Sequence, residues 1–139
     1  MSVGQAIIDF LIADGGVSAL VDERVSQGAV NENEALPRIW IGRSSRDNDI
    51  DLAGSEFVID TFDLEIVADH TEGNDGVSQA LEIADAVRTL LHGHYGDFAD
   101  ITVKGVFVDD QTDDYLPKSL DSPDGIYLSA LSIRILPNE

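Results

Sequence analysis

The sequence predicts an α+β domain, in which a mostly antiparallel sheet of about four to five strands carries two main helices packed on one face. Three observations support this fold class. Apolar residues recur at helical spacing in residues 2–14 and 77–92. Strand-like alternation dominates residues 56–68 and returns in 101–108 and 126–136. Helices and strands are therefore mixed along the chain, which is typical of a sheet covered by helices on one side.

The first predicted helix covers residues 2–14. Ser2 and Gln5 have the spacing of a capping box. Four apolar residues fall on one face of this helix: Val3, Ile7, Phe10 and Leu11. Gly15 and Gly16 are expected to end the helix, and a short helical turn is expected over residues 17–22.

Three strands are predicted next, over residues 24–30, over "RIWIG" at 38–42, and over 56–68. The third strand has the clearest pattern, because Asp63 and Glu65 alternate with apolar residues. This alternation predicts one covered and one wetter face of the sheet. The apolar set comprises Phe62, Leu64, Ile66 and Ala68.

The second main helix is predicted over residues 77–92, with Gly93 just past its end. Strands 101–108 and 126–136 complete the sheet. Two long polar stretches, 43–55 and 109–125, show no hydrophobic periodicity and are predicted to be loops. Loops longer than about 12 residues in a compact domain are usually functional or disordered.

The composition indicates one ordinary folded domain over residues 1–139. Hydrophobic residues make up 43% of the chain, and no apolar run approaches the length of a membrane span, so a soluble protein is expected. Cysteine is absent, which excludes disulfides and thiolate metal sites. The net charge of −19, from 27 acidic and 8 basic residues, indicates adaptation to high salt. The negative charge also argues against nucleic-acid binding, because phosphate binding needs clustered cationic side chains.

The acidic and histidine-containing motifs do not form convincing metal or catalytic sites. In "DNDID", Asp47, Asp49 and Asp51 have the spacing of calcium ligands, but the turn glycine and the final glutamate of an EF-hand are missing. "HGH" at 92–94 lacks a visible third zinc ligand, and His92 is better explained as a cation at a helix C-terminus. Neither a nucleophilic serine motif nor a phosphate loop occurs. The sequence therefore predicts no enzyme activity, no catalytic residue, no metal and no cofactor.

The remaining interpretation is an interaction module that binds through the two polar stretches. Arginine is enriched at interfaces, and three arginines cluster near one another in an otherwise anionic chain, although they could simply neutralise nearby aspartates. Trp40 lies on the strand face opposite Ile39 and Ile41 and could be an anchor or a core residue. The second stretch could dock onto a neighbour or fold back onto its own sheet. The interface candidates are Arg38, Trp40, Arg43, Arg46, Asp47, Asp49, Tyr115, Leu116 and Leu120.

Four segments together resemble the tail completion family of tailed viruses, also described as tail terminator or tail-to-head joining proteins. They are the N-terminal helix running into "IADGGVSALVDERV", the Pro-led strand "LPRIWIG", the strand "TFDLEIVAD" followed by a helix that ends "AVRTLLHG", and the final strand "GIYLSALSIRIL". Their order and spacing span nearly the whole chain. The strong negative charge departs from common members and suggests a virus of a halophilic, haloarchaeal host.

The resemblance implies a virion structural protein that is assembled in the host cytoplasm and located at the tail–neck junction. Such proteins form a homo-oligomeric ring, usually of six copies, that terminates the tail tube and lets DNA pass through its lumen. The expected partners are the tail tube protein on one side and a head–tail connector or neck protein on the other. The family has no catalytic residues or cofactors, and its loop after the Pro-led strand, here 43–55, is expected to become ordered on assembly.

Two alternatives remain open at the level of the sequence. A head-closure or adaptor protein of the neck shares the size and the ring symmetry. A small halophilic cation-binding protein or enzyme is the third class. One mechanistic hypothesis follows from the charge: acidic side chains lining the bore of a ring would repel DNA phosphates and let the genome pass without trapping it.

Overall fold

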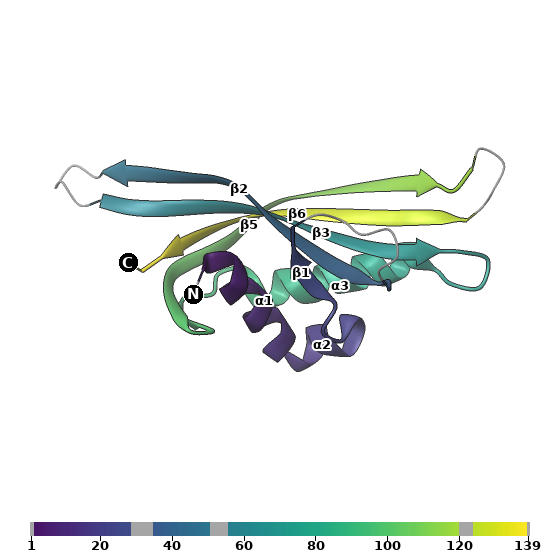
Figure 1. Ribbon diagram of the computed structural model, residues 1–139, viewed down its shortest axis with the longest axis horizontal. Helices are drawn as coiled ribbons and strands as arrows, with labels where there is room; N and C mark the ends of the chain where they lie inside the picture. Colours follow the sequence, from purple (N-terminus) through teal and green to yellow (C-terminus); the bar gives the residue numbers. More distant parts are fainter. Residues whose placement is uncertain (1, 29–34, 51–55, 120–123, 139) are drawn as a thin grey trace.

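The computed structural model describes residues 2–28, 35–50, 56–119 and 124–138, and it confirms an α+β fold (Figure 1). Three helices and six strands follow one another along this part of the chain. Their bounds are α1 Val3–Ala13, α2 Gly15–Val21, β1 Val25–Gln27, β2 Arg38–Ile50, β3 Glu56–His70, α3 Gly76–Leu91, β4 Gly96–Phe98, β5 Ile101–Pro117 and β6 Gly125–Pro137.

The strands form one mixed sheet in the order β1-β2-β3-β6-β5-β4. β1 pairs in parallel with β2, whereas every other neighbouring pair is antiparallel. The prediction of four to five strands was therefore too low. The missed strand, β4, has only three residues, and so short a segment carries no measurable alternation.

The helices lie on one side of the middle of the sheet (Figure 1). Buried apolar side chains of the helices and the strands form one hydrophobic core. The predicted alternation of β3 is confirmed, because Asp63 and Glu65 are exposed while the apolar residues between and beside them are buried. Helices α1 and α3 and strands β2, β3, β4 and β6 supply the largest fully buried side chains among the described residues: Ile7, Leu11, Ile39, Ile41, Leu64, Ile66, Ile83, Leu91, Phe98, Leu131, Ile133 and Ile135. Val17 of α2 and Val106 of β5 are also fully buried.

Helix α1 begins as predicted but ends differently. Ser2 Oγ accepts a hydrogen bond from the Gln5 amide at 3.1 Å, whereas the Gln5 side chain donates to Asp9, so only half of the capping box forms. Gly15 and Gly16 do not end the helix, because they begin α2. The reason is Asp14, whose Oδ2 accepts a hydrogen bond from the Val17 amide at 2.9 Å and caps the second helix.

Helices α1 and α2 meet at a sharp bend. No single helix in the described ranges is long and apolar enough to cross a membrane. By length and composition alone, α1 and α2 pass that test as a pair bent by 90°.

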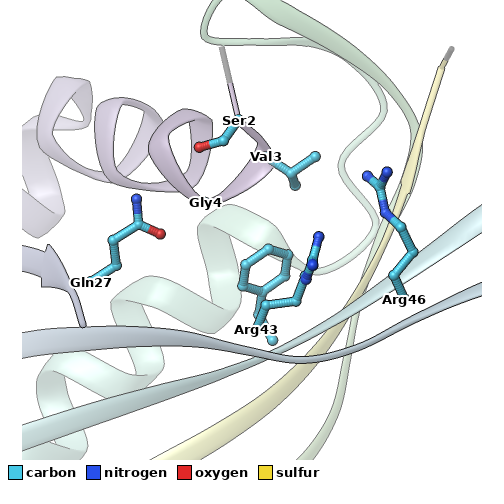
Figure 2. Close-up of a pocket in the computed structure, with 7 residues that line it drawn as sticks. Ser2, Val3, Gly4, Gln27, Arg43 and Arg46 are labelled. Atoms are coloured by element: carbon cyan, nitrogen blue, oxygen red, sulfur yellow. The ribbon is translucent and has the colours of Figure 1, made fainter. Parts of the chain in front are cut away.

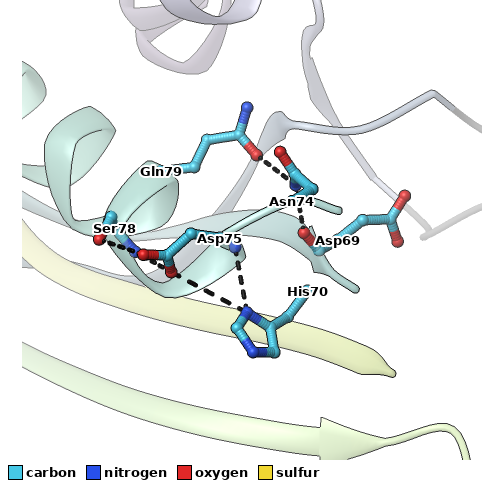
Figure 3. Close-up of polar contacts among 7 residues, drawn as sticks. Asp69, His70, Asn74, Asp75, Ser78 and Gln79 are labelled. Atoms are coloured by element: carbon cyan, nitrogen blue, oxygen red, sulfur yellow. Dashed lines mark hydrogen bonds and ion pairs between the residues drawn. The ribbon is translucent and has the colours of Figure 1, made fainter. Parts of the chain in front are cut away.

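Helix α3 starts directly after β3, and a compact set of polar contacts fixes this junction (Figure 3). Asp75 is the N-cap: its carboxylate accepts hydrogen bonds from the Ser78 amide at 3.1 Å and the Ser78 hydroxyl at 2.7 Å. Asn74 Nδ2 donates to the Asp69 carbonyl at 2.6 Å. These bonds tie the first turn of the helix to the last residues of the strand.

His70 contributes to the same junction as a neutral acceptor. Its Nδ1 accepts a hydrogen bond from the Gly76 amide at 3.1 Å. The Asp75 carboxylate lies 4.0 Å from the same nitrogen. A nitrogen that accepts an amide hydrogen bond carries no proton of its own, so this approach is not an ion pair in the structure.

The cap makes stability depend on pH. Hydrogen bonds from Ser78 lower the pKa of Asp75 below its ordinary value of 3.8. A carboxyl group whose pKa falls on folding contributes stability above its unfolded pKa and loses it as the pH falls through the folded pKa. We therefore expect Asp75→Ala to be less stable than the native chain at neutral pH, with the difference shrinking below pH 3.8. Urea titrations across this range measure it, and a constant gap at every pH would contradict the assignment. Asp85→Ala, which removes an exposed acid from the same helix, is the control.

Candidate functional site

Two long hairpin arms extend beyond the helical layer in opposite directions, and they form the candidate functional site (Figure 1). The β2–β3 arm consists of residues 43–50 of β2 and 56–62 of β3. The β5–β6 arm consists of residues 109–117 of β5 and 125–132 of β6. Backbone pairing continues almost to the end of each arm, with Ile50 opposite Glu56 and Pro117 opposite Gly125.

The arms correct the prediction that residues 43–55 and 109–125 are loops. Most of both stretches forms strands, while residues 51–55 and 120–123 lie outside the described residues. The sequence pattern does not reveal these strands because residues 43–48 and most of 109–117 are exposed, so neither face of these segments needs to be apolar. The hydrogen-bonded ladder to the partner strand holds the arms extended without an alternating pattern.

An ion pair between facing residues joins the two strands of the β2–β3 arm. Arg46 lies opposite Asp60 and binds it in a bidentate manner, with Nε–Oδ1 at 2.7 Å and Nη2–Oδ2 at 2.8 Å. Asp60 is 0% exposed, whereas the Arg46 side chain is 36% exposed. The pair therefore buries a carboxylate inside the arm and holds the guanidinium of Arg46 across the two strands.

Sequence reasoning named Arg46 but missed Asp60. A signal was present, because Asp60 is in phase with Phe62 and Leu64 on the covered face of β3. A charged residue at such a position needs a partner.

Arg43 and Arg46 also line a pocket of about 470 Å³ between the start of α1 and the β2–β3 arm (Figure 2). Ser2, Val3 and Gly4 form one side of the pocket, and Gln27 and Phe62 complete its lining. Arg43 is exposed and makes no hydrogen bond or ion pair with any described residue. The pocket therefore combines a free guanidinium with the positive end of the α1 dipole.

Arg38 and Trp40 lie away from the arms, in the body of the sheet. The Arg38 guanidinium stands 5.3 Å from the centre of the Trp40 ring, and its Nη2 donates to Ser26 Oγ at 3.1 Å. Trp40 is 7% exposed. Two of the predicted interface residues are thus buried, while Asp47 is exposed on the arm. Asp49 lies in β2 opposite Phe57, and nothing further is described for its side chain.

The β5–β6 arm carries a row of aspartates. Asp109 binds Arg134 in a bidentate manner at 2.6 and 3.0 Å, and this bonding raises the pKa of Arg134 above its ordinary value. Asp110 accepts a hydrogen bond from the amide of the next residue at 2.9 Å, and Asp114 does the same at 2.8 Å. Asp113 accepts from the Ser129 hydroxyl at 2.7 Å. The arm is therefore strongly acidic, and each of these four carboxylates accepts at least one hydrogen bond.

The end of the β5–β6 arm holds the predicted apolar candidates. Tyr115 contacts the His70 ring edge-on at 5.9 Å and is half-buried, so it folds back onto its own sheet. Leu116 is 50% exposed and lines a second pocket, of about 480 Å³, next to Thr71 and Lys118. Leu120 lies outside the described residues.

The histidines serve structural contacts. The prediction that His92 acts as a cation at the end of α3 is wrong, because its Nδ1 accepts a hydrogen bond from the Val108 amide at 3.0 Å. His94 packs on Phe98, with its Nε2 2.7 Å from the Asp97 carbonyl. Among the residues that the structure describes, no three His, Cys, Asp or Glu side chains are grouped so that they could hold a metal ion.

Comparisons with known proteins point to one family and one fold. The family model described as "Tail completion protein gp17" matches residues 5–125. A chain from the solved "Virion of native gene transfer agent (GTA) particle" matches with a TM-score of 0.74 at 17% identity, over 99% of this chain and 96% of that chain. A second solved chain matches with a TM-score of 0.47 at 14% identity over 96% of each chain, which is too weak to support an argument. No curated protein matches significantly.

Proposed function

The chain belongs to the tail completion protein gp17 family, because that model covers most of its length, and on this premise we propose that copies of it form a ring that terminates the tail tube and joins the tail to the head. Family membership itself makes the chain a virion structural protein. The ring, its position and its partners are the proposal, with six copies as the expected number.

The pair of arms is the single observation that carries the proposal. A protein that works alone gains little from two hairpins that extend past its core, since their polar faces bury little apolar surface. A subunit between neighbours and axial partners can use both arms for contact. Arg43, Arg46, Asp47 and Asp49 on one arm, with Leu116 on the other, are the proposed contact residues.

A ring at the junction between tail and head would have two axial partners. We propose that one side of the ring binds the tail tube protein and the other binds a head–tail connector or neck protein. The apolar contact on the axial side would come from Leu116, whose side chain is half-exposed at the end of the β5–β6 arm. Buried members of the candidate set, Arg38 and Trp40, would instead fix the sheet that supports the arms.

The net charge supports a role for the lumen. With −19 charges per chain, a ring carries a strong negative field, and acidic side chains around its bore would repel the phosphates of passing DNA. A reconstruction showing an arginine-lined bore would contradict the proposal that the bore is acidic.

The same net charge supports a virus of a halophilic host. Neither proposal requires catalysis, and the role in the virion is structural.

Deletion of the gene from the virus tests the proposed function. We expect the infected cells to accumulate filled heads and separate tails of uneven length, because nothing caps the tube or offers a joining surface. Electron microscopy of the lysate measures this, and supplying the native chain from a plasmid should restore joined particles.

The same experiment distinguishes the alternatives. Tails of normal length beside heads that have lost their DNA would indicate a head-closure protein and contradict the proposal. Joined, infectious particles without the chain would exclude any essential role at the junction.

A further inference from the structure

We propose that neighbouring copies meet through opposite edges of the sheet, with the Arg43 edge of β2 in one copy against the Asp110 and Asp114 edge of β5 in the next. The inference rests on the proposed ring and names the surfaces that build it. Three observations support it: the position of the two edges, the exposed Arg43 on one edge against the carboxylates of the other, and the different state of their polar groups.

The two edges lie on opposite sides of the sheet. β1 pairs with β2 only at residues 39–41, so residues 42–50 of β2 have no strand beyond them in the described part of the chain. β4 pairs with β5 only at residues 101–103. The segment after α3 covers the next part of β5, through bonds of Gly93 and His94 with Val106. Residues 109–117 are therefore the open part of the β5 edge.

The β5 edge has two of its amides occupied, and it carries exposed carboxylates. Asp110 and Asp114 accept hydrogen bonds from the amides of Gln111 and Tyr115, so these donors are not available to an added strand. A carboxylate has about four acceptor positions, and each of these bonds uses one. Both aspartates are exposed and can accept a guanidinium from another molecule.

The β2 edge offers the matching group. Arg43 is exposed and unengaged by any described residue, and it lies at the rim of the pocket below α1 (Figure 2). Arg46 beside it is bound in a bidentate manner to Asp60, so Arg43 is the cation that this edge presents. The region that receives a carboxylate is therefore already assembled in the single chain.

The charged side chains favour a contact between a β2 edge and a β5 edge over a contact between two edges of the same kind. Two β5 edges would bring six aspartates together, since each carries Asp110, Asp113 and Asp114 besides the Asp109 that is paired with Arg134, and such a contact is repulsive. Two β2 edges would place the exposed Arg43 residues together. A contact between unlike edges places Arg43 against the β5 carboxylates and leaves one free edge of each kind. This is a heterologous contact, which generates a ring when the rotation between copies closes.

Crosslinking of single-cysteine variants tests the edge contact, because the native chain has no cysteine. Ser45→Cys places a thiol on the β2 edge and Thr112→Cys places one on the β5 edge, both at exposed positions. With a short bis-maleimide linker, a mixture of the two variants should give a covalent dimer, while each variant alone should not. A chain with both substitutions should give a ladder of oligomers.

Charge reversal adds specificity to the test. Arg43→Glu in the Ser45→Cys chain should reduce the dimer yield about tenfold or more, equivalent to at least about 1.4 kcal/mol. Asp110→Arg with Asp114→Arg in the Thr112→Cys chain should restore it. Lys104→Glu, which changes the net charge equally but lies outside the contact, is the matched control and should leave the yield unchanged.

The outcomes separate this inference from the proposed function. Rings that form without the Ser45–Thr112 crosslink, or Ser45→Cys chains that crosslink to each other, would overturn the edge contact and leave the ring intact. Chains that stay monomeric in every salt concentration and beside tail tubes would overturn both.

Discussion

Replacing Arg46 by methionine is expected to destabilise the chain by about 2–4 kcal/mol, because it leaves a buried carboxylate without its partner. Asp60 is 0% exposed and takes both of its hydrogen bonds in the bidentate pair from Arg46. The methionine stem replaces the packing of the arginine stem, so most of the loss reflects charge. Urea denaturation at constant salt measures the change in the free energy of unfolding.

Two further variants sharpen this test. Arg43→Met removes an exposed arginine from the same arm and should change the stability by less than about 0.5 kcal/mol. The double variant Arg46→Met with Asp60→Leu should regain much of the stability, because an apolar pair needs no compensating charge. Equal effects of Arg46→Met and Arg43→Met would contradict the structural role of the buried pair.

Replacing Gly76 by alanine is expected to cost about 3 kcal/mol, although the same change in most helices is stabilising. A Cβ at this position would lie 2.7 Å from the carbonyl carbon of Asp69 and 2.9 Å from the Cα of His70. Both atoms belong to the backbone at the end of β3, so α3 would have to move away from the sheet. Thermal and urea unfolding measure the loss.

Gly73→Ala is the matched control for this prediction. Gly73 lies three residues earlier, and an added Cβ would meet nothing within 4 Å. We expect a change of less than about 1 kcal/mol, in either direction. A Gly76→Ala chain as stable as this control would show that the close approach of α3 to β3 is not a fixed feature of the fold.

The helices and the central strands could be predicted because burial imposes a period on them. The alternation around Asp63 and Glu65 and the apolar stripe of residues 77–92 both report a face that packs on the core. The start of α1 followed from Ser2, whose hydroxyl caps the Gln5 amide. Its end did not, because a single aspartate, Asp14, closes one helix and opens the next.

The arms and the edge charges could not be predicted, because they depend on pairing between distant segments. A strand exposed on both faces has no apolar period, and its extended form depends on the partner strand. The bond between Arg46 and Asp60 joins residues 14 positions apart, and the bond between Arg134 and Asp109 joins residues 25 apart. The sequence shows that cationic side chains are scarce. The register of the paired strands then determines which arginines bind a carboxylate of their own chain and which do not.

The central claim is that the two arms hold copies of this chain in a ring between the tail tube and the head. A three-dimensional reconstruction of the neck of intact particles tests it most directly. We expect a closed ring at the head-proximal end of the tube, with β2 of each copy beside β5 of its neighbour. A junction without this chain, or copies whose arms touch no other molecule, would contradict it.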